Sequence, residues 1–363
     1  MILIPLTILF FVTDLDVFLQ SRFYSKTPGW HYLNYPIWDF IYRYGIFPGY
    51  LFAIAGLIMI SVSYWNKKFA PLRKPSLVLV FVMVIGPGIL VNLVLKDHMG
   101  RPRPREITEF GGNEEYVCPC VPGGVKNGKS FPCGHCSMGF YLAIPYLFLR
   151  NRRKVAAWLF LVFGISSGII IGISRMIAGG HFASDILWAG GIVWLTALAG
   201  YYLFKADLPY VITSLNGESE RKQARTATIV VGFLLPAITV GLLLATPYIS
   251  KKSLYKSLPP KHEKILFSAN VLDAIVDLND DTCISAKYEV NAFGFPNSKI
   301  RPSWEDGDTL RYILHYMGWF TEVRNRIQMT LPFHHEGEYT IYIREGRAIL
   351  NVHDSIKEKF GLI

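Results

Sequence analysis

The chain has 363 residues, of which 51% are hydrophobic, and a formal net charge of +10 at pH 7. Length and composition alone are compatible with one large soluble domain or with a membrane protein that carries an appendage. The distribution of apolar residues excludes the first possibility, because stretches close to the length that crosses a hydrocarbon core, about 20 residues, recur as far as residue 248. We therefore expect a chain embedded in a membrane, and no nucleic acid as a partner.

Seven apolar stretches are predicted to cross the membrane as helices. They cover residues 1–19, 46–65, 76–95, 136–150, 155–173, 185–204 and 226–248. The first carries Asp14 and Asp16 near its end, and the fourth is short. The first lacks the basic segment and the cleavage site of a signal peptide, so we interpret it as a retained span. The predicted fold is an all-α polytopic membrane helix bundle, with a core of six spans among seven in total.

Basic residues concentrate in three of the predicted connections. These residues are Lys67, Lys68, Arg73 and Lys74, then Arg150, Arg152, Arg153 and Lys154, then Lys205, Arg221, Lys222 and Arg225. By parity the three connections share one side, which the excess of Lys and Arg marks as cytoplasmic. The opposite connection, residues 96–129, is also basic. The number of spans between connections therefore shows which of them share a side more firmly than charge shows which side is cytoplasmic.

Three separated fragments fall together on the opposite side of the predicted bundle. They are Lys96 with Arg103-Pro104, then Phe131-Pro132-Cys133-Gly134-His135, then Ser174-Arg175 with His181 and Asp185. The first ends the third span, the second opens the fourth, and the third lies between the fifth and sixth. Their positions predict one site at a membrane boundary.

The residue types in these fragments suit phosphate chemistry. A phosphate monoester carries about two negative charges near neutral pH, and Lys96, Arg103 and Arg175 supply fixed cations. Backbone N–H groups near Cys133 and Gly134 offer further donors, because glycine permits close approach of the main chain to an anion.

Two histidines complete the predicted chemistry. His181 is the candidate nucleophile, and Asp185, four residues later on one helical face, can orient its imidazole. His135 is then the candidate acid that protonates the leaving alkoxide and later activates water.

These fragments resemble the signature motifs of the type 2 phosphatidic acid phosphatase superfamily, K-x6-RP, PSGH and SR-x5-H-x3-D. The resemblance covers about residues 46–204, and Cys133 stands where that family usually has serine. It implies a metal-independent phosphatase without a cofactor that works through a phosphohistidine. The implied catalytic residues are His181, His135 and Asp185, and the implied phosphate contacts are Lys96, Arg103, Cys133, Gly134, Ser174 and Arg175.

The resemblance implies a membrane lipid phosphate as substrate. The stretches 100–112 and 180–188 are similar to bacterial members of the superfamily that include lipid A 1-phosphatases, which makes removal of the 1-phosphate of lipid A the leading expectation. Phosphatidylglycerophosphate and undecaprenyl diphosphate stay open as alternatives. Transfer of the phosphate to another lipid, and a non-catalytic lipid-binding role, also stay open. With the basic connections inside, the enzyme would lie in a bacterial inner membrane with its site facing the periplasm.

The cysteines and three glycines allow other interpretations. Cys118, Cys120, Cys133 and Cys136 have spacings loosely similar to a zinc site. A disulfide between Cys136 and either Cys118 or Cys120 competes with that interpretation. Glycines at positions 164, 168 and 172 are typical of close helix packing and not of a binding site.

The domain prediction separates a transmembrane domain, residues 1–248, from a soluble C-terminal domain, residues 249–363, on the same side as the site. The C-terminal domain is predicted to be α+β, with a helix near 306–325 and a meander of strands near 328–333, 338–344 and 348–353. His334 and His335 are interpreted as part of a turn. Residues 20–45 are rich in Trp and Tyr, which is typical of a segment in the headgroup region.

Overall fold

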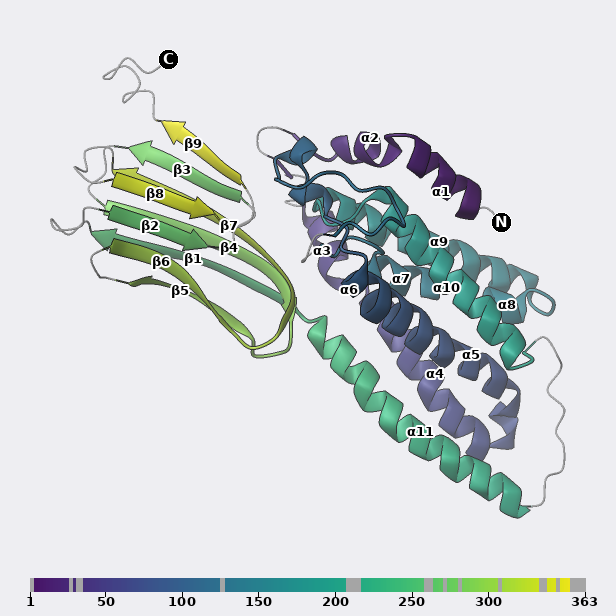
Figure 1. Cartoon of the computed structure of the whole chain (residues 1–363). Helices are drawn as coiled ribbons and strands as arrows, with labels where there is room; N and C mark the ends of the chain where they lie inside the picture. The colour runs from purple at the N-terminus through teal and green to yellow at the C-terminus, as the bar shows by residue number, and fades with distance from the viewer. Residues whose placement is uncertain are drawn as a thin grey trace. The chain divides into compact units, whose positions relative to one another are not determined.

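The computed structural model describes residues 3–25, 29–30, 35–124, 128–206, 217–257, 264–269, 273–279, 283–305, 309–332, 338–343 and 347–352. The chain divides into two compact units: the first comprises Met1–Phe110 and Glu114–Leu242, and the second comprises Leu243–Ile363 with the short segment Gly111–Asn113. The first unit is built from helices and the second from strands, as Figure 1 shows.

The helical unit contains long apolar helices and short polar ones. Its α-helices are α1 (Leu3–Val12), α2 (Leu15–Ser21), α3 (Pro36–Tyr44), α4 (Phe47–Trp65), α5 (Arg73–Met83), α6 (Lys96–His98), α7 (Gly134–Tyr141), α8 (Tyr146–Leu149), α9 (Lys154–Ile177), α10 (Ala183–Leu203) and α11 (Gly217–Leu244). A π-helical stretch, η3 (Val84–Leu95), joins α5 to α6, and 3-10 segments are η2 (Lys67–Leu72), η4 (Pro104–Glu106) and η5 (Thr108–Phe110).

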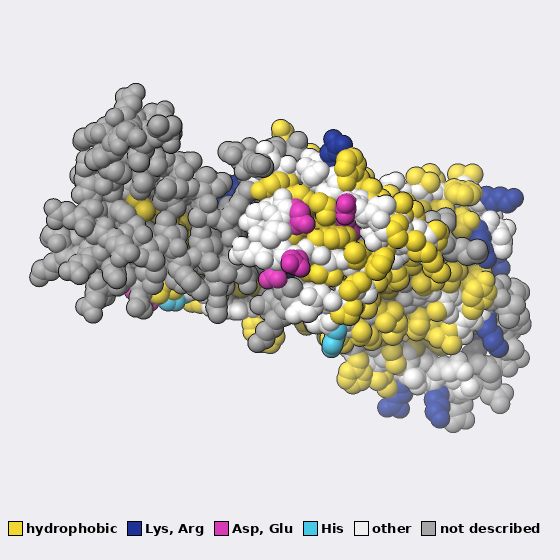
Figure 2. Space-filling view, turned by 45° about the horizontal axis from the view of Figure 1, so that its top comes forward, with side chains coloured by type: hydrophobic (Ala, Val, Ile, Leu, Met, Phe, Trp, Pro, Cys, Tyr) yellow, Lys and Arg dark blue, Asp and Glu magenta, His cyan; other side chains and the backbone are white. Residues whose placement is uncertain are grey.

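Within the described residues, five helical segments are long and apolar enough to cross a membrane. They are Pro36–Trp65, Lys67–His98, Lys154–Ile177, Ala183–Leu203 and Lys222–Leu244. The pair α1 and α2 bends by 79° and makes a sixth if it counts as one span. Large apolar side chains, among them Val155 and Leu159, point outward, and Figure 2 shows hydrophobic side chains over much of the visible helical surface. The helical unit is therefore a polytopic membrane core.

The predicted count of seven spans stays a prediction, because two of the stretches are not single helices. The first is broken between Val12 and Leu15. The fourth is divided into α7 and α8, and both of these short helices pack along α9.

The three basic connections lie at one end of the bundle. The Nζ of Lys74 donates to the carbonyl of Lys205 at 2.8 Å, and the guanidinium of Arg150 lies 5.7 Å from the ring centre of Tyr201. Helix α9 runs from Lys154 at this end to Ile177, which is about 35 Å away at 1.5 Å per residue. The segment after α9 therefore lies at the opposite end.

Close helix packing accounts for the glycine stripe of α9. A side chain at Gly168 would meet the ring of Phe140 at 2.5 Å, and one at Gly172 would meet Ile186 at 2.7 Å. A side chain at Gly164 would collide with the backbone of Ala143. Small residues thus let α9 contact its neighbours closely, as the spacing predicts.

The second unit is a β-sandwich. Its strands are β1 (Pro247–Ser257), β2 (Lys264–Ala269), β3 (Asp273–Asn279), β4 (Cys283–Gly294), β5 (Lys299–Glu305), β6 (Thr309–Met317), β7 (Phe320–Pro332), β8 (Glu338–Ile343) and β9 (Arg347–Val352). One sheet has the order β1-β4-β7-β3-β9 and the other β5-β6-β2-β8. Buried residues of both sheets, among them Tyr288, Tyr312 and Ile327, form a shared core.

The predicted helix near 306–325 is wrong, because β6 and β7 occupy this segment. Tyr312 and Leu314 are buried at alternate positions of β6, and Gly318, with a φ of +97°, turns the chain into β7. Burial at every second residue is typical of a strand, and it outweighs the apolar spacing that suggested a helix. Every element in the described part of residues 247–352 is a strand, so the α+β class is also corrected.

The predicted meander is wrong as well. β8 pairs in parallel with β2, whereas β9 pairs in parallel with β3 in the other sheet. The His334–His335 turn lies outside the described residues.

Candidate functional site

The loop between α9 and α10 presents His181 at the end of the bundle opposite the basic connections. Gly179 adopts a φ of +62°, which favours glycine, and a side chain there would meet the ring of Trp30 at 2.7 Å. Trp30 is buried against Tyr24 and Phe110. Trp30, which belongs to the Trp- and Tyr-rich segment 20–45, thus supports this loop from within the protein.

Two acceptors hold one nitrogen of the His181 imidazole. Its Nδ1 lies 2.6 Å from the carbonyl oxygen of Ser130 and 3.6 Å from Oδ2 of Asp185. A carbonyl can only accept, so Nδ1 carries the proton and the lone pair of the neutral ring lies on Nε2. The sequence predicts the orienting role of Asp185, but the shorter contact belongs to the backbone of Ser130.

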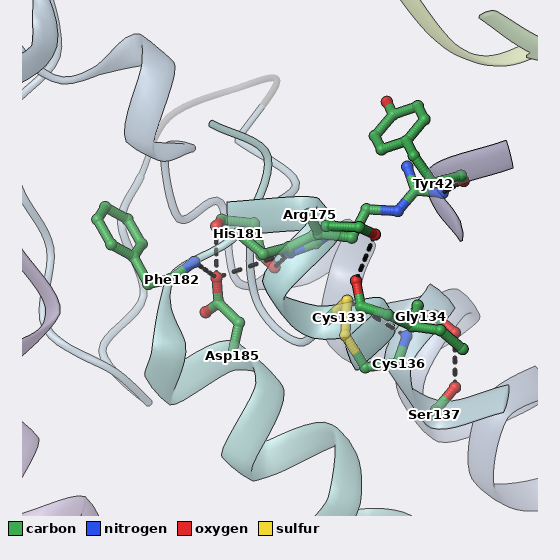
Figure 3. Close-up of a disulfide and its surroundings, with 12 residues drawn as sticks. Tyr42, Cys133, Gly134, Cys136, Ser137, Arg175, His181, Phe182 and Asp185 are labelled. Atoms are coloured by element: carbon green, nitrogen blue, oxygen red, sulfur yellow. Dashed lines mark hydrogen bonds and ion pairs between the residues drawn. A yellow bond between two sulfur atoms is a disulfide. The ribbon is translucent and has the colours of Figure 1, made fainter. Parts of the chain in front are cut away.

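Asp185 is completely buried and accepts several hydrogen bonds. Its Oδ2 accepts from the hydroxyl of Ser130 at 2.6 Å and from the backbone N–H of Phe182 at 2.8 Å. The second bond satisfies a free N–H at the start of α10, where the helix dipole favours a negative charge. Figure 3 shows Asp185 directly below His181.

Arg101 is the buried counter-ion of Asp185. Its guanidinium donates to Oδ1 of Asp185, to Oδ2 of Asp16 at 2.9 Å and to the hydroxyl of Ser184 at 2.9 Å, and its side chain is fully buried. Burial lowers the pKa of Arg101, but the two carboxylates outweigh burial and hold the pKa above its usual value. The two carboxylates thus keep the buried Arg101 guanidinium charged.

Asp16 connects helix α2 to the start of α10. Its Oδ1 accepts from the backbone N–H of Ser184 at 2.9 Å, and its Oδ2 accepts from the Ser184 hydroxyl. From the same helix, Gln20 donates to the carbonyl of Met176 at 2.7 Å. Two buried polar side chains of α2 therefore hold both flanks of the His181 loop.

The charges of Lys96 and Arg103 act on the imidazole of His181. Burial is the largest influence and lowers the pKa of His181, Asp185 raises it, and the charges of Lys96 and Arg103 lower it further. The net effect is a pKa below the usual value. His181 is thus neutral near pH 7, the form that can attack phosphorus.

Arg175 belongs to the same end of the bundle and is positioned by α3. Its guanidinium lies 3.8 Å from the ring centre of Tyr42 and donates to the Tyr42 carbonyl at 2.9 Å. Figure 3 shows its side chain extending toward Tyr42. The cation–π contact and the hydrogen bond together restrict the orientation of the Arg175 guanidinium plane. This orientation determines how the guanidinium can bind a phosphate.

The second fragment contains a disulfide, and its partners differ from the pair that competes with a zinc site in the sequence. Cys133 pairs with Cys136, whereas Cys118 and Cys120 are free, so the predicted pairing of Cys136 with either of these is wrong (Figure 3). The reason is local: the two residues face each other across the first turn of α7, with Cα atoms 5.6 Å apart. The disulfide also removes two thiols from the alternative zinc set.

The pairing changes what Cys133 can offer to a phosphate. In the disulfide it has no thiol proton, and its backbone N–H donates to the carbonyl of Asp185 at 3.2 Å. This last bond joins the second fragment to the third. Gly134 allows α7 to approach η3 closely, because a side chain at this position would collide with that of Asn92 in η3.

The other predicted site residues differ in solvent exposure. His135 is half-buried on the first turn of α7, between the two disulfide cysteines in sequence. Ser174 is buried, and its hydroxyl donates to the carbonyl of Ile171 at 2.6 Å. The predicted roles of His135, Gly134 and Ser174 toward substrate stay predictions.

Three residues of this site, Ser130, Arg101 and Asp16, belong to none of the motifs in the sequence. Asp16 was noticed only as an acidic residue that weakened a predicted span. A carboxylate inside an apolar stretch is costly unless it has a partner, so its position was itself a signal of function. The partner, Arg101, is 85 residues away in sequence, and that distance hid the pair.

This arrangement can perform nucleophilic attack on a phosphate ester. It offers a neutral imidazole with a free Nε2, a buried carboxylate that stabilises the imidazolium which forms, and cations nearby. The site lies at the end of apolar helices, where lipid headgroups are found.

Comparisons with known proteins agree with this chemistry. Residues 75–208 match the model of the PAP2 superfamily, within the helical unit. The lipid A 4'-phosphatase of Francisella tularensis subsp. novicida (strain U112) is 31% identical over 202 residues, which is 54% of this chain and 89% of that protein.

Rhizobial relatives match over shorter regions. The lipid A 4'-phosphatase of Rhizobium leguminosarum is 33% identical over 121 residues, 32% of this chain and 50% of that protein. The lipid A 1-phosphatase of Rhizobium etli (strain ATCC 51251 / DSM 11541 / JCM 21823 / NBRC 15573 / CFN 42) is 31% identical over 125 residues, 32% of this chain and 47% of that protein. No solved structure matches the chain. The motifs, the membrane helices and these relatives together place the chain in the PAP2 superfamily, as a membrane lipid phosphatase.

Proposed function

We propose that this protein removes a phosphate from lipid A, at the periplasmic face of a bacterial inner membrane, through a phosphohistidine on His181. The observation that carries the proposal is the Nδ1 of His181, held by Ser130 and Asp185, which leaves Nε2 as the nucleophile. The length of the match to the lipid A 4'-phosphatase of Francisella favours the 4'-phosphate. The rhizobial lipid A 1-phosphatases favour the 1-phosphate as the second candidate.

The first step of the proposed reaction forms the phosphoenzyme. Nε2 of His181 attacks phosphorus, the bond from phosphorus to the sugar oxygen breaks, and His135 gives a proton to that oxygen. Lys96, Arg103 and Arg175 neutralise the phosphoryl oxygens. Asp185 stabilises the imidazolium without taking its proton.

The second step releases phosphate. His135, now neutral, accepts a proton from water, whose oxygen attacks phosphorus and breaks the bond to Nε2. Free inorganic phosphate leaves and both histidines return to their first state. Attack by a lipid hydroxyl in place of water would make the enzyme a transferase.

Location supports a periplasmic site. The basic connections lie at the end of the bundle opposite His181, and an excess of Lys and Arg marks the cytoplasmic side. The placement of the C-terminal unit on the periplasmic side is part of the same proposal.

The test uses the purified full chain in detergent with four substrates in parallel: lipid A, phosphatidylglycerophosphate, phosphatidic acid and undecaprenyl diphosphate. Free phosphate and lipid products are measured without added metal. We expect preferential release from lipid A, and mass spectrometry of the product distinguishes loss of the 4'-phosphate from loss of the 1-phosphate. A preference for another of the four lipids would replace the substrate.

Two variants control the test. His181→Ala should release no phosphate, whereas His315→Ala changes an exposed histidine of β6 and should match the wild type. After brief reaction with ³²P-labelled lipid A, label should stay on the wild-type chain in alkali and be lost in acid, as a phosphohistidine requires. Label that passes to a second lipid without free phosphate would support transfer.

A further inference from the structure

Two neighbouring turns at one end of the β-sandwich carry exposed apolar side chains. The first turn joins β4 to β5 and the second joins β6 to β7. Trp319 is 77% exposed, Met317 43%, Tyr316 42% and Phe295 39%. We call these four residues the apolar tip. Isolated exposed apolar residues are ordinary, but four that lie on two adjacent turns or at the end of the strand before one of them indicate a contact surface.

The apolar tip is a fixed structure. The backbone N–H of Phe295 donates to the carbonyl of Trp319 at 2.9 Å, and the hydroxyl of Ser298 donates to the same carbonyl at 3.1 Å. The N–H of Trp319 donates in turn to the Ser298 hydroxyl oxygen at 3.1 Å. Gly318 makes the turn possible with its φ of +97°. The backbone of Trp319 is thus held on both sides while its ring points away from the core.

The chain places this end of the sandwich next to a membrane span. The N–H of Gly294 donates to the carbonyl of Thr246 at 3.0 Å, and Phe293 pairs with Pro247 at the start of β1. Thr246 follows Leu244, the last residue of α11, by two positions. Two residues reach at most about 7 Å. The first turn therefore stays close to the end of α11 in any arrangement of the two units.

We propose that the apolar tip inserts into the headgroup region of the bilayer beside the end of α11 and anchors the β-sandwich to the membrane surface. Trp and Tyr are favoured at this depth, because the ring is apolar while its N–H or O–H can meet water and headgroups. Burial of the apolar area of these side chains in the bilayer stabilises the anchor. The proposal assigns a lipid surface, and not a protein, as the occupant.

The opposite end of the same sandwich supplies a matched reference. Tyr255 is 69% exposed near the end of β1, where it pairs with Ser285. It is eight positions from Pro247, which is about 27 Å along a strand. Tyr255 is an exposed aromatic residue of the same unit that the proposal leaves in water.

The test measures the depth of a single tryptophan in the full chain reconstituted in lipid vesicles. The chain has eight tryptophans, so the emission of Trp319 is taken as the difference between wild type and Trp319→Phe. It is compared in vesicles of ordinary lipid and of lipid brominated near the headgroup, which quenches on contact. We expect the bromolipid to remove more than half of the Trp319 emission.

Two further variants in the Trp319→Phe background complete the test. Met317→Trp restores a tryptophan to the apolar tip and should be quenched like Trp319. Tyr255→Trp should emit equally in both lipids. Equal emission of Trp319 and of the Met317→Trp variant in both lipids would overturn the proposal, as would equal quenching at all three positions, which would mean that the sandwich lies along the membrane. The readout does not involve phosphatase activity.

Discussion

Buried side chains of the β-sandwich come from alternate strand positions and are almost all apolar, for example Ile284, Val290 and Ile327. Buried side chains around His181 include a guanidinium and two carboxylates from segments far apart in sequence. The sandwich core is stabilised by apolar area, which tolerates substitution of similar volume. The site is stabilised by matched charges, where removal of one member leaves another unpaired. The two regions should therefore respond differently to single substitutions.

The largest effect is expected for the proposed nucleophile, His181. His181→Ala removes the only proposed attacking nitrogen, so kcat should fall by at least about 10⁴-fold, as for other covalent nucleophiles. Release of phosphate from lipid A measures it, with His315→Ala as the control. A residual rate within about 100-fold of wild type would point to another nucleophile.

Removal of the buried cation is the next largest. Arg101→Met leaves the buried carboxylates of Asp16 and Asp185 without their counter-ion, which should cost about 3–5 kcal/mol of stability and displace His181 enough to lower kcat about 10²-fold. Thermal unfolding and initial rates measure the two effects.

A double-mutant cycle separates this role from general destabilisation. Adding Asp16→Asn to Arg101→Met removes one of the two unpaired charges and should recover part of the stability. Arg43→Met, at a partly exposed pair with Asp39, should leave kcat unchanged. If Arg101→Met kept full activity, the positioning role of Arg101 would be wrong.

A smaller effect is expected on the pH dependence. The pKa of His181 is lowered by burial, and by Lys96 and Arg103, and the neutral ring attacks, so kcat should fall as pH decreases through that lowered pKa. Lys96→Met removes a positive neighbour and raises the pKa of His181, so the acid limb should move to higher pH. Loss of the proposed contact of Lys96 with the phosphate should also lower kcat/KM about tenfold. An acid limb that moves to lower pH would contradict this assignment.

The disulfide should matter less to rate than to stability. It closes a short loop, so Cys133→Ser should cost about 2 kcal/mol. The serine hydroxyl supplies a hydrogen-bond donor that the disulfide lacks, so activity should be kept or increased. Cys136→Ser removes the same disulfide and leaves a thiol at position 133. An inactive Cys133→Ser beside an active Cys136→Ser would show that the sulfur of Cys133 has a role of its own.

The smallest effect on catalysis is expected in the sandwich. Ile327→Ala creates a cavity in the core of the second unit and should cost that unit about 2–5 kcal/mol. The value of kcat should stay within about twofold of wild type, because the residue touches no part of the site. Separate melting transitions for the two units, with unchanged initial rates, would support this contrast.

The same contrast explains what the sequence could predict. Apolar length identified the membrane helices, and the three fragments identified His181 and Asp185 as neighbours. Arg101 with Asp16 was missed because no short-range pattern joins residues that meet only after folding. The helix predicted near 306–325 was wrong because aromatic and aliphatic residues of β6 and β7 fit either period over a short window. The Cys133–Cys136 disulfide was not predicted, because the geometry of the first turn of α7 decides the partner of Cys136. The loop that carries Cys118 and Cys120 does not.

The hydrogen bonds between Asp16 of α2 and Ser184 of α10 have a consequence for synthesis of the protein. Asp16 leaves the ribosome 85 residues before Arg101 and 168 residues before Ser184. Until those partners exist, a carboxylate inside an apolar stretch is costly in lipid, so the first helical pair should wait at the membrane surface. Insertion of α10 then completes its hydrogen bonds and closes the His181 loop in one event. A nascent chain that ends before α10 would have no assembled site, and the enzyme should gain activity only late in its translation.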